Sequence, residues 1–200
     1  MQTLDLIPTA AEVGRLVAGV REDQLTAPTP CAGTPVAGLL DHLVGLTLAF
    51  RLGAEKQPVT GAPRASADEL PADWRTRLPE QLTAIAAAWA QPAAWEGVTE
   101  VGGATLPGAA MGVVAADELL VHGWDLAVAT GQAYTPDPVA VARCLAFVTD
   151  LAGSAPQVRD GMFGPPVPVP DAAPDLDRLL GRTGRDPGWS PSAVRQHPVG

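Results

Sequence analysis

The stretch PGAAMGVVAADELLVHGWDLAVATG, residues 107–131, is the strongest candidate for a regular element in the chain. Pro107 suits the start of a helix, because its fixed φ is helical and the first turn does not need its missing N–H. Gly131 suits the end, because glycine adopts the left-handed conformation that terminates many helices. The stretch therefore predicts a helix from Pro107 to about Thr130 and a helical fold around it.

Shorter helices are predicted on both sides of this stretch. Before it, apolar residues recur at i, i+3, i+4 and i+7, and after it Asp137–Pro138 and PDLDRLLG begin two more helices. The predicted helices cover residues 8–20, 35–50, 72–90, 137–151 and 174–181. Pro79 is expected to kink the third of these or to split off its first turn. The segments 55–72 and 96–106 are predicted to be loops, the second an extended crossover.

These elements predict an all-α protein. Long helices joined by connections that return the chain are typical of an up-and-down bundle of four or five helices. The bundle is expected to occupy residues 1–152. Residues 153–200 are rich in Gly and Pro, which argues against long regular elements there. They are predicted to form an irregular, extended tail that packs on the bundle, with about the last ten residues loose.

The composition fits a single domain with a sizeable core. Of 200 residues, 46% are hydrophobic and 18% charged, with a net charge of −9. Neutralising phosphates requires a basic surface, so neither nucleic acid nor a membrane is expected as a partner. No apolar run approaches the ~18 residues of a membrane span, and the N-terminus lacks the pattern of a secretory signal. We expect a cytoplasmic monomer or homodimer that binds a small molecule.

The two cysteines, Cys31 and Cys144, do not form a CxxC pair. In a cytoplasmic protein both are expected to be reduced, and a zinc site made of thiolates is not expected. Cys31 is predicted to be a buried packing residue, as free cysteines commonly are. Trp124 is likewise predicted to pack in the core. A metal site in this chain would have to use other side chains.

A carboxylate and an imidazole lie one turn apart on the long predicted helix. Glu118 and His122 are four positions apart and share a helix face, and Asp125 follows three positions later on that face. One helix can thus offer an oxygen and a nitrogen to one ion, with Asp125 holding the His122 ring or a bound water. The alternative is an ordinary surface pair of Glu118 and His122, with Asp125 an exposed carboxylate.

A third ligand has to come from another helix, and His42 is the only other histidine within a predicted helix. His197 lies in the C-terminal end that is expected to be loose. Gly38, Gly45 and Ala49 lie four, three and seven positions from His42, and such small residues let a second helix approach closely. His42 is therefore the candidate third ligand. Taken alone, it could also be a partly buried histidine without a ligand role.

Several segments resemble one protein family. They are TPC at 29–31, LLDHLVG at 39–45, ELLVHGWDLAVATGQ at 118–132 and FGPPVPVPDAAPDLDRLLGRTGRDPGW at 163–189. They are similar to the metal-binding branch of the DinB-like superfamily, which includes the N-terminal domain of mycothiol-dependent maleylpyruvate isomerase. The pattern H…E-x3-H-G-W-D-L is the most specific part. The resemblance implies a DinB-type four-helix bundle with metal ligands at His42, Glu118 and His122.

The chain departs from this family in two places. Thr34 stands where relatives usually carry a tryptophan, and 200 residues leave no room for the second domain of the isomerase. The resemblance therefore implies a metal site and a general thiol-linked chemistry rather than maleylpyruvate isomerisation itself.

Two imidazoles and one carboxylate leave the fourth position of a tetrahedral zinc ion open, as in catalytic sites. Such an ion lowers the pKa of bound water to about 7 and deprotonates a bound thiol. We therefore predict zinc, with nickel or iron as alternatives, and a low-molecular-weight thiol as cosubstrate. Arg182 and Arg185 could bind the carboxylate of an acidic substrate or thiol, or could tie the tail to the bundle.

Competing hypotheses about function stay open at this point. One is a metal-dependent thiol transferase or isomerase that acts on a small electrophile. Another is a non-catalytic metal- or ligand-binding protein, such as a sensor. Two histidines and one carboxylate also form the facial triad of non-haem iron enzymes, which would change the ion but not the ligands.

Overall fold

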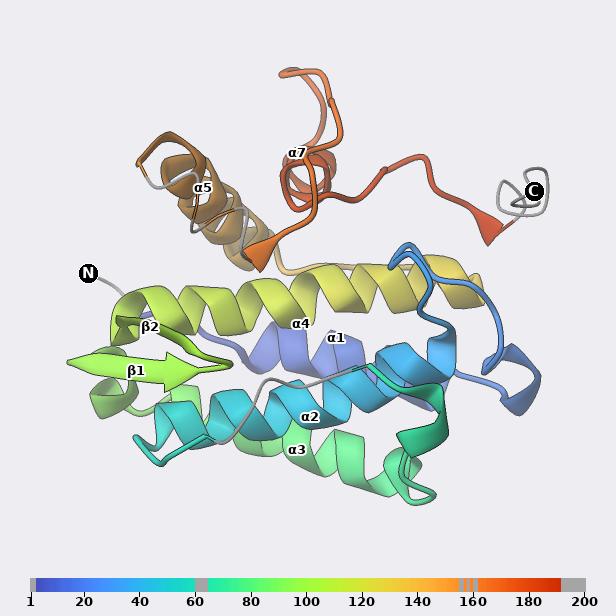
Figure 1. The fold of residues 1–200 in the computed structure, drawn as a ribbon, viewed down its shortest axis with the longest axis horizontal. Coiled ribbons are helices and arrows are strands. Elements are labelled where there is room, and N and C mark those ends of the chain that lie inside the picture. Colours follow the sequence, from blue (N-terminus) through green and yellow to red (C-terminus); the bar gives the residue numbers. More distant parts are fainter. Residues whose placement is uncertain (1–2, 60–64, 155–156, 158, 160–161, 192–200) are drawn as a thin grey trace.

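The computed structural model describes residues 3–59, 65–154, 157, 159 and 162–191, and it is mostly helical (Figure 1). The α-helices are α1 Ile7–Ala18, α2 Val36–Ala54, α3 Trp74–Trp89, α4 Gly108–Thr130, α5 Pro138–Ser154 and α7 Asp175–Arg182. Short 3₁₀ helices are η1 Glu22–Gln24, η2 Ala67–Glu69 and η3 Pro92–Trp95, and the strands are β1 Val98–Val101 and β2 Ala104–Pro107. The predicted helical class is confirmed, with a small two-stranded sheet added.

The central element of the fold is α4. It packs against α1 and α2 on one side and against α5 on the other (Figure 1), and 19 of its 23 residues are buried. A helix that is buried on all sides needs apolar residues on all of its faces. This explains why the sequence of α4 has so few polar residues. Gly131 ends it with a left-handed φ of 68°, so the predicted end of this helix is confirmed.

The first four helices surround one core but do not alternate in direction. Each of α1 and α2 packs on both α3 and α4. Near the start of α2, Asp41 accepts a hydrogen bond at 3.1 Å from the amide of Ser66, on the segment that leads into α3. Just after the end of α2, Lys56 donates to the carbonyl of Ala94, just after α3, at 3.0 Å. Consequently α2 and α3 run in the same direction (Figure 1).

The predicted up-and-down order is therefore wrong, and the length of one connection permits this. The chain from Ala54 to Trp74 can extend by about 3.3 Å per residue, whereas α2 advances only about 1.5 Å per residue. This connection can return along the whole of α2 before α3 begins. A short turn would instead have forced α3 to run antiparallel to α2.

The segment 96–106, predicted to be an extended loop, contains a β-hairpin instead. β1 pairs antiparallel with β2, and Val101 lies opposite Ala104. Between them, Gly102 and Gly103 have φ angles of 62° and 84°. The favoured two-residue hairpin turn requires positive φ at both central residues, which glycine adopts without strain. The hairpin packs on α2 and α4 and closes the end of the core at the start of α4.

A second layer formed by α5 and α7 covers α4 (Figure 1). The Asp137 carboxylate accepts hydrogen bonds from the amides of Val139 and Ala140 at 3.3 and 3.1 Å. This caps the start of α5 where Asp137–Pro138 predicted a helix start. The predicted short helix in the C-terminal part is α7. Residues 192–200, which make up nearly all of the end expected to be loose, lie outside the described residues.

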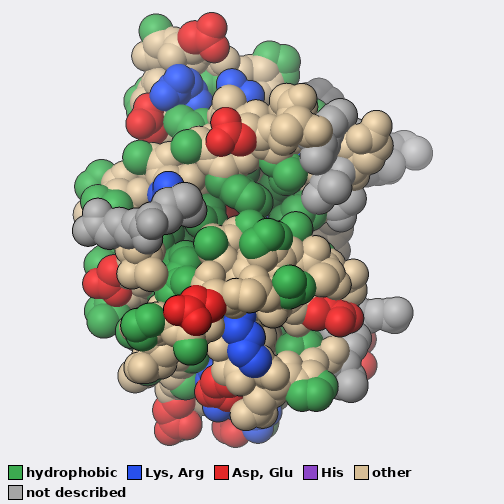
Figure 2. All heavy atoms as spheres, turned by 90° about the vertical axis from the view of Figure 1, so that its left-hand side faces the viewer, with side chains coloured by type: hydrophobic (Ala, Val, Ile, Leu, Met, Phe, Trp, Pro, Cys, Tyr) green, Lys and Arg blue, Asp and Glu red, His purple; other side chains and the backbone are tan. Residues whose placement is uncertain are grey.

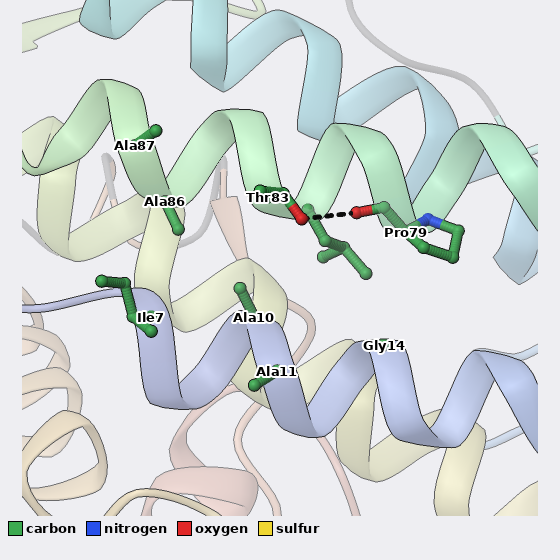
Figure 3. A pocket seen from close by; sticks show the side chains of 9 residues that line it. Ile7, Ala10, Ala11, Gly14, Pro79, Thr83, Ala86 and Ala87 are labelled. Carbon is green, nitrogen blue, oxygen red and sulfur yellow. Dashed lines mark hydrogen bonds between the residues drawn. The ribbon is translucent and has the colours of Figure 1, made fainter.

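A shallow apolar groove of about 410 Å³ lies between α1 and α3 (Figure 3). It is lined by Ile7, Ala10, Ala11, Gly14, Pro79, Leu82, Thr83, Ala86 and Ala87. Pro79 does not split α3, which continues unbroken from Trp74 to Trp89, and the Thr83 hydroxyl donates to the Pro79 carbonyl at 3.0 Å. Because its lining contains no titratable side chain, the groove offers no chemistry.

Gly112, near the start of α4, is expected not to tolerate even alanine. A Cβ there would lie 2.5 Å from the Trp95 ring and 2.8 Å from the Trp89 ring. Gly112→Ala should therefore lower the free energy of unfolding by about 1–3 kcal/mol, measured by urea denaturation. Gly153→Ala in α5 is the matched control, because nothing lies within 4 Å of its Cβ, and it should stabilise by about 0.4–1 kcal/mol. Equal effects of the two substitutions would contradict this packing.

Helix α2 and the charged surface concern the expectation that neither a membrane nor nucleic acid is a partner. Within the described part of the chain, α2 is the one helix long and apolar enough to cross a membrane, but 67% of that stretch is buried inside the protein. Figure 2 shows charged side chains of both signs interspersed on one face of the molecule. This face therefore carries no continuous basic patch of the kind that binds nucleic acid.

Candidate metal centre

The structure brings His42 of α2 together with Glu118 and His122 of α4. A Glu118 carboxylate oxygen, Oε2, lies 3.2 Å from His122 Nε2 and 3.8 Å from His42 Nε2. The two imidazole rings meet edge to face, with centroids 4.9 Å apart. One donor atom from each residue lies within 4.8 Å of the other two. The surface-pair alternative does not describe this arrangement, because three side chains from two helices converge on one point.

The centre is partly open to solvent. The side chains of His42 and Glu118 retain 22% and 26% of their exposure, whereas His122 retains 11%. Two nitrogens and one oxygen suit zinc, nickel or iron. An ion held by these three side chains would keep room for a ligand from solvent, which is the arrangement of catalytic rather than structural zinc sites.

The charges of the centre also suit a cation. Burial alone would raise the pKa of Glu118, but hydrogen bonds with His122 and His42 hold it well below its usual range. The pKa of His122 is raised despite burial, because Asp125, Cys31 and Glu118 all favour its protonated form. In the protonated ring, the proton on Nε2 of His122 therefore occupies the place that a metal ion would take, and metal binding should release this proton.

Asp125 lies behind His122, on the side away from Glu118. Its Oδ2 is 3.0 Å from His122 Nδ1, and the Asp125 side chain is fully buried. An ionised carboxylate can only accept hydrogen bonds, so Nδ1 of His122 must carry the proton. The lone pair of the neutral ring then lies on Nε2, which faces Glu118 and His42. This is the arrangement in which a carboxylate orients a metal-binding histidine.

Of the two arginines predicted to bind a substrate or thiol, the structure places one beside the centre. Arg185 Nη2 donates to Asp125 Oδ2 at 3.0 Å, and Arg185 Nε lies 3.4 Å from Oδ1. The backbone carbonyl of Arg182 accepts a hydrogen bond from Nη2 of Arg159 at 2.6 Å. Arg185 is thus engaged by the protein itself, which fits the alternative that it ties the tail to the bundle.

Cys31 is not the buried packing residue that was predicted. It is half-buried, and its thiol lies 3.1 Å from Asp125 Oδ2 and 3.9 Å from His122 Nδ1. Arg185 Nη2 lies 3.1 Å from the same sulfur. The prediction failed because it rested on the average behaviour of free cysteines, although TPC was one of the segments that carried the family resemblance.

Cys31, His122 and Asp125 form a second group whose donor atoms lie within 4.8 Å of one another. The guanidinium of Arg185 lies against both Cys31 and Asp125, so a positive charge already occupies this place. A metal ion there would be repelled by Arg185. The group of His42, Glu118 and His122 is therefore the better candidate for a metal centre.

Two of the remaining candidates from the sequence, Trp124 and Cys144, are buried. Trp124 is 5% exposed and belongs to the core, as predicted. His197 lies outside the described residues. Cys144 is fully buried on α5, and burial raises the pKa of its thiol, which makes it a poor nucleophile.

Comparison with known proteins adds the family. Residues 8–127 match the family model of the mycothiol maleylpyruvate isomerase N-terminal domain. The chain belongs to this family. Two similar proteins come from Mycobacterium tuberculosis, strains CDC 1551 / Oshkosh and ATCC 25618 / H37Rv, and both are named only as uncharacterized proteins. Each is 34% identical over 178 residues, which is 85% of this chain and 91% of the relative. No solved structure matches the chain.

The match to the mycothiol maleylpyruvate isomerase N-terminal domain family confirms the resemblance predicted from the sequence. The matched residues include His42, Glu118 and His122, as well as Cys31 and Asp125. Arg185 lies beyond them, in the part of the chain that follows α7. The cluster around Asp125 therefore joins the matched residues to a residue that lies beyond them.

Proposed function

We propose that this protein binds one divalent cation, zinc in the first place, through His42, Glu118 and His122. We further propose that it activates a low-molecular-weight thiol for reaction with a small electrophile, as a transferase or isomerase. The observation that carries the proposal is the convergence of two imidazoles and one carboxylate within 4.8 Å. The family supports the thiol, because mycothiol is part of its description.

We also propose that residues 1–152 form a DinB-type four-helix bundle and that residues 153–200 form a tail that packs on it. The protein is proposed to be cytoplasmic and to be a monomer or homodimer. Its proposed partner is a small molecule and not nucleic acid or a membrane. The net charge of −9 supports this, because phosphate-rich partners require a basic surface.

The residues of the centre have distinct roles in this proposal. Glu118 supplies the negative charge, and His42 and His122 supply neutral nitrogen donors. Asp125 keeps the proton on Nδ1 of His122. When bound, the ion would lower the pKa of a thiol in the remaining position. The protein would then need no nucleophilic cysteine of its own.

A non-catalytic metal-binding or sensor protein is the second candidate. One observation favours it: Asp125 and Arg185 are paired with each other at 3.0 Å. Neither is therefore free to act on a substrate as a general acid or base. In this alternative the ion would be the ligand that the protein senses or stores.

Metal content is the first test. Protein purified aerobically from its native host should contain about one zinc ion per chain by elemental analysis, since a three-ligand site of this kind holds one ion. Iron or nickel at that stoichiometry would keep the centre but change its ion. A metal-free protein that also fails to take up zinc in solution would remove the proposal.

Thiol chemistry is the second test. Cobalt-substituted protein should gain a sulfur-to-metal charge-transfer band when mycothiol is added, because a thiolate would enter the open position. Zinc-loaded protein should consume mycothiol in the presence of an electrophile such as 1-chloro-2,4-dinitrobenzene, and chelation should stop this. Stoichiometric metal with neither response would favour the non-catalytic alternative.

A further inference from the structure

We infer that Arg185 is a positioning residue of the metal centre, which it serves by holding Asp125 so that His122 directs Nε2 toward Glu118 and His42. This inference rests on the proposed metal site and adds a residue that lies beyond residues 8–127, which the family model matches. The geometry behind it is a chain of contacts from the C-terminal segment to the ring of His122.

The Asp125 carboxylate is held at both oxygens. Oδ2 accepts from Arg185 Nη2 at 3.0 Å, from the Cys31 thiol at 3.1 Å and from His122 Nδ1 at 3.0 Å. Oδ1 faces Arg185 Nε at 3.4 Å. Arg185 thus contacts both oxygens, which restricts rotation of the carboxylate more than a single contact would. The direction in which Asp125 presents Oδ2 to His122 is set by Arg185.

Arg185 is itself anchored. Its amide donates to the carbonyl of Leu180 at 2.8 Å, and its Nη1 donates to the carbonyl of Thr183 at 3.0 Å. Gly184 just before it has a φ of +85°, and a Cβ there would lie 2.9 Å from Gly164. The turn that carries Arg185 is therefore tightly packed. A side chain presented from such a turn can position another group, whereas one on a loose tail could not.

The charges point to the same role. Asp125 is fully buried, and its Oδ2 lies 3.0 Å from Nη2 of Arg185. The Asp125–Arg185 pair is neutral as a whole. The carboxylate of Glu118 therefore remains as the negative charge available to a cation. Without Arg185, Asp125 would be a second buried negative charge beside the centre and would lose the cation that holds its carboxylate in place.

A purely structural tie is the alternative role for Arg185, and the two make different predictions. A tie affects how firmly the C-terminal segment is held but leaves the folded centre unchanged. A positioning residue affects the metal and the His122 proton even when the protein remains folded. The test therefore combines a stability control with two readouts at the centre.

Arg185→Gln should weaken zinc binding by about 10–100-fold, measured by competition with a chromophoric chelator, as for other partners of metal-ligating histidines. It should also shift the visible spectrum of cobalt-substituted protein. Arg185→Lys keeps the charge but loses the two-point contact, and its affinity should lie between those of Arg185→Gln and wild type. Arg178→Gln is the matched control, because Arg178 pairs with Asp175 on α7 at 2.6 Å and should leave both readouts unchanged.

Asp125→Asn supplies the coupling test. If Arg185 acts through Asp125, the double variant Arg185→Gln, Asp125→Asn should bind zinc about as well as Asp125→Asn alone. Additive losses would show that Arg185 acts independently of Asp125 and would overturn the inference. So would wild-type affinity and an unchanged cobalt spectrum in a folded Arg185→Gln protein.

A readout that needs no metal separates this inference from the proposed function. In wild-type protein the Nδ1–H proton of His122 should exchange slowly with water in NMR spectra, and in Arg185→Gln it should exchange faster. If wild-type protein binds no zinc, the proposed function falls, and this exchange rate alone decides the role of Arg185. If Arg185→Gln and Arg185→Lys both unfold, Arg185 is a structural tie and the inference is rejected.

Discussion

Replacing His122 with alanine is expected to weaken zinc binding by at least about 100-fold, more than the loss of a group that only supports a ligand. His122 is the residue common to both sides of the centre, since Nε2 lies 3.2 Å from Glu118 and Nδ1 lies 3.0 Å from Asp125. The substitution removes a ligand and leaves Asp125 without one of its hydrogen-bond donors. Chelator competition and elemental analysis of the purified protein measure the effect.

Two further variants and a control define the pattern that must accompany this loss. His42→Ala removes the ligand from the other helix, and Glu118→Gln keeps the shape of the side chain while it removes the charge. Both should also abolish stoichiometric zinc. Glu80→Ala changes an exposed carboxylate of α3 and should bind zinc as wild type does. Unchanged stoichiometry and affinity in all three ligand variants would refute the assignment of the centre.

The sequence predicted those parts of the fold that depend on local chemistry. The limits of α4 followed from Pro107 and Gly131, and the start of α5 followed from Asp137, because each of these residues acts on its immediate neighbours. The hairpin of β1 and β2 was missed although a local signal existed. Gly102 and Gly103 stand between two short runs, and a Gly-Gly pair in that place is a known sign of a two-residue hairpin.

Other features depend on contacts between distant residues, which periodicity and spacing do not report. The parallel course of α2 and α3 depends on where the chain from Ala54 to Trp74 returns, and its length permits either direction. The Cys31–Asp125 and Asp125–Arg185 contacts join residues 94 and 60 positions apart. Glu118 and His122 could be paired from their spacing, whereas the partners of Asp125 could be found only in three dimensions.

Asp117→Asn is expected to change the pH dependence of stability more than any surface substitution. Asp117 lies on α4 and is 2% exposed, and its buried Oδ1 has no hydrogen-bond partner in the described part of the protein. Burial, together with the neighbouring negative charge of Glu118, raises the pKa of Asp117 from 3.8 to about 7. In the unfolded chain the carboxyl loses its proton near its usual pKa, whereas in the folded protein it keeps it until about pH 7.

The sign of the effect follows from this difference. Between pH 3.8 and 7 the folded protein binds a proton that the unfolded chain has lost, so this group destabilises the fold increasingly as pH rises. At about 1.4 kcal/mol for each pH unit, the loss approaches ~4 kcal/mol above pH 7. Asparagine does not titrate. The stability of Asp117→Asn relative to wild type should therefore grow from pH 4 to pH 7 and then level off.

Urea denaturation in the presence of a chelator, at a series of pH values, measures this difference while the other titrating groups cancel. Asp150→Asn, at an exposed position of α5, is the matched control and should show a flat difference. A flat difference for Asp117→Asn as well would contradict the raised pKa. The same measurement with zinc links this carboxyl to the proposed centre. A cation beside Glu118 would favour the ionised form of Asp117, so zinc should reduce the pH-dependent gap between the two proteins.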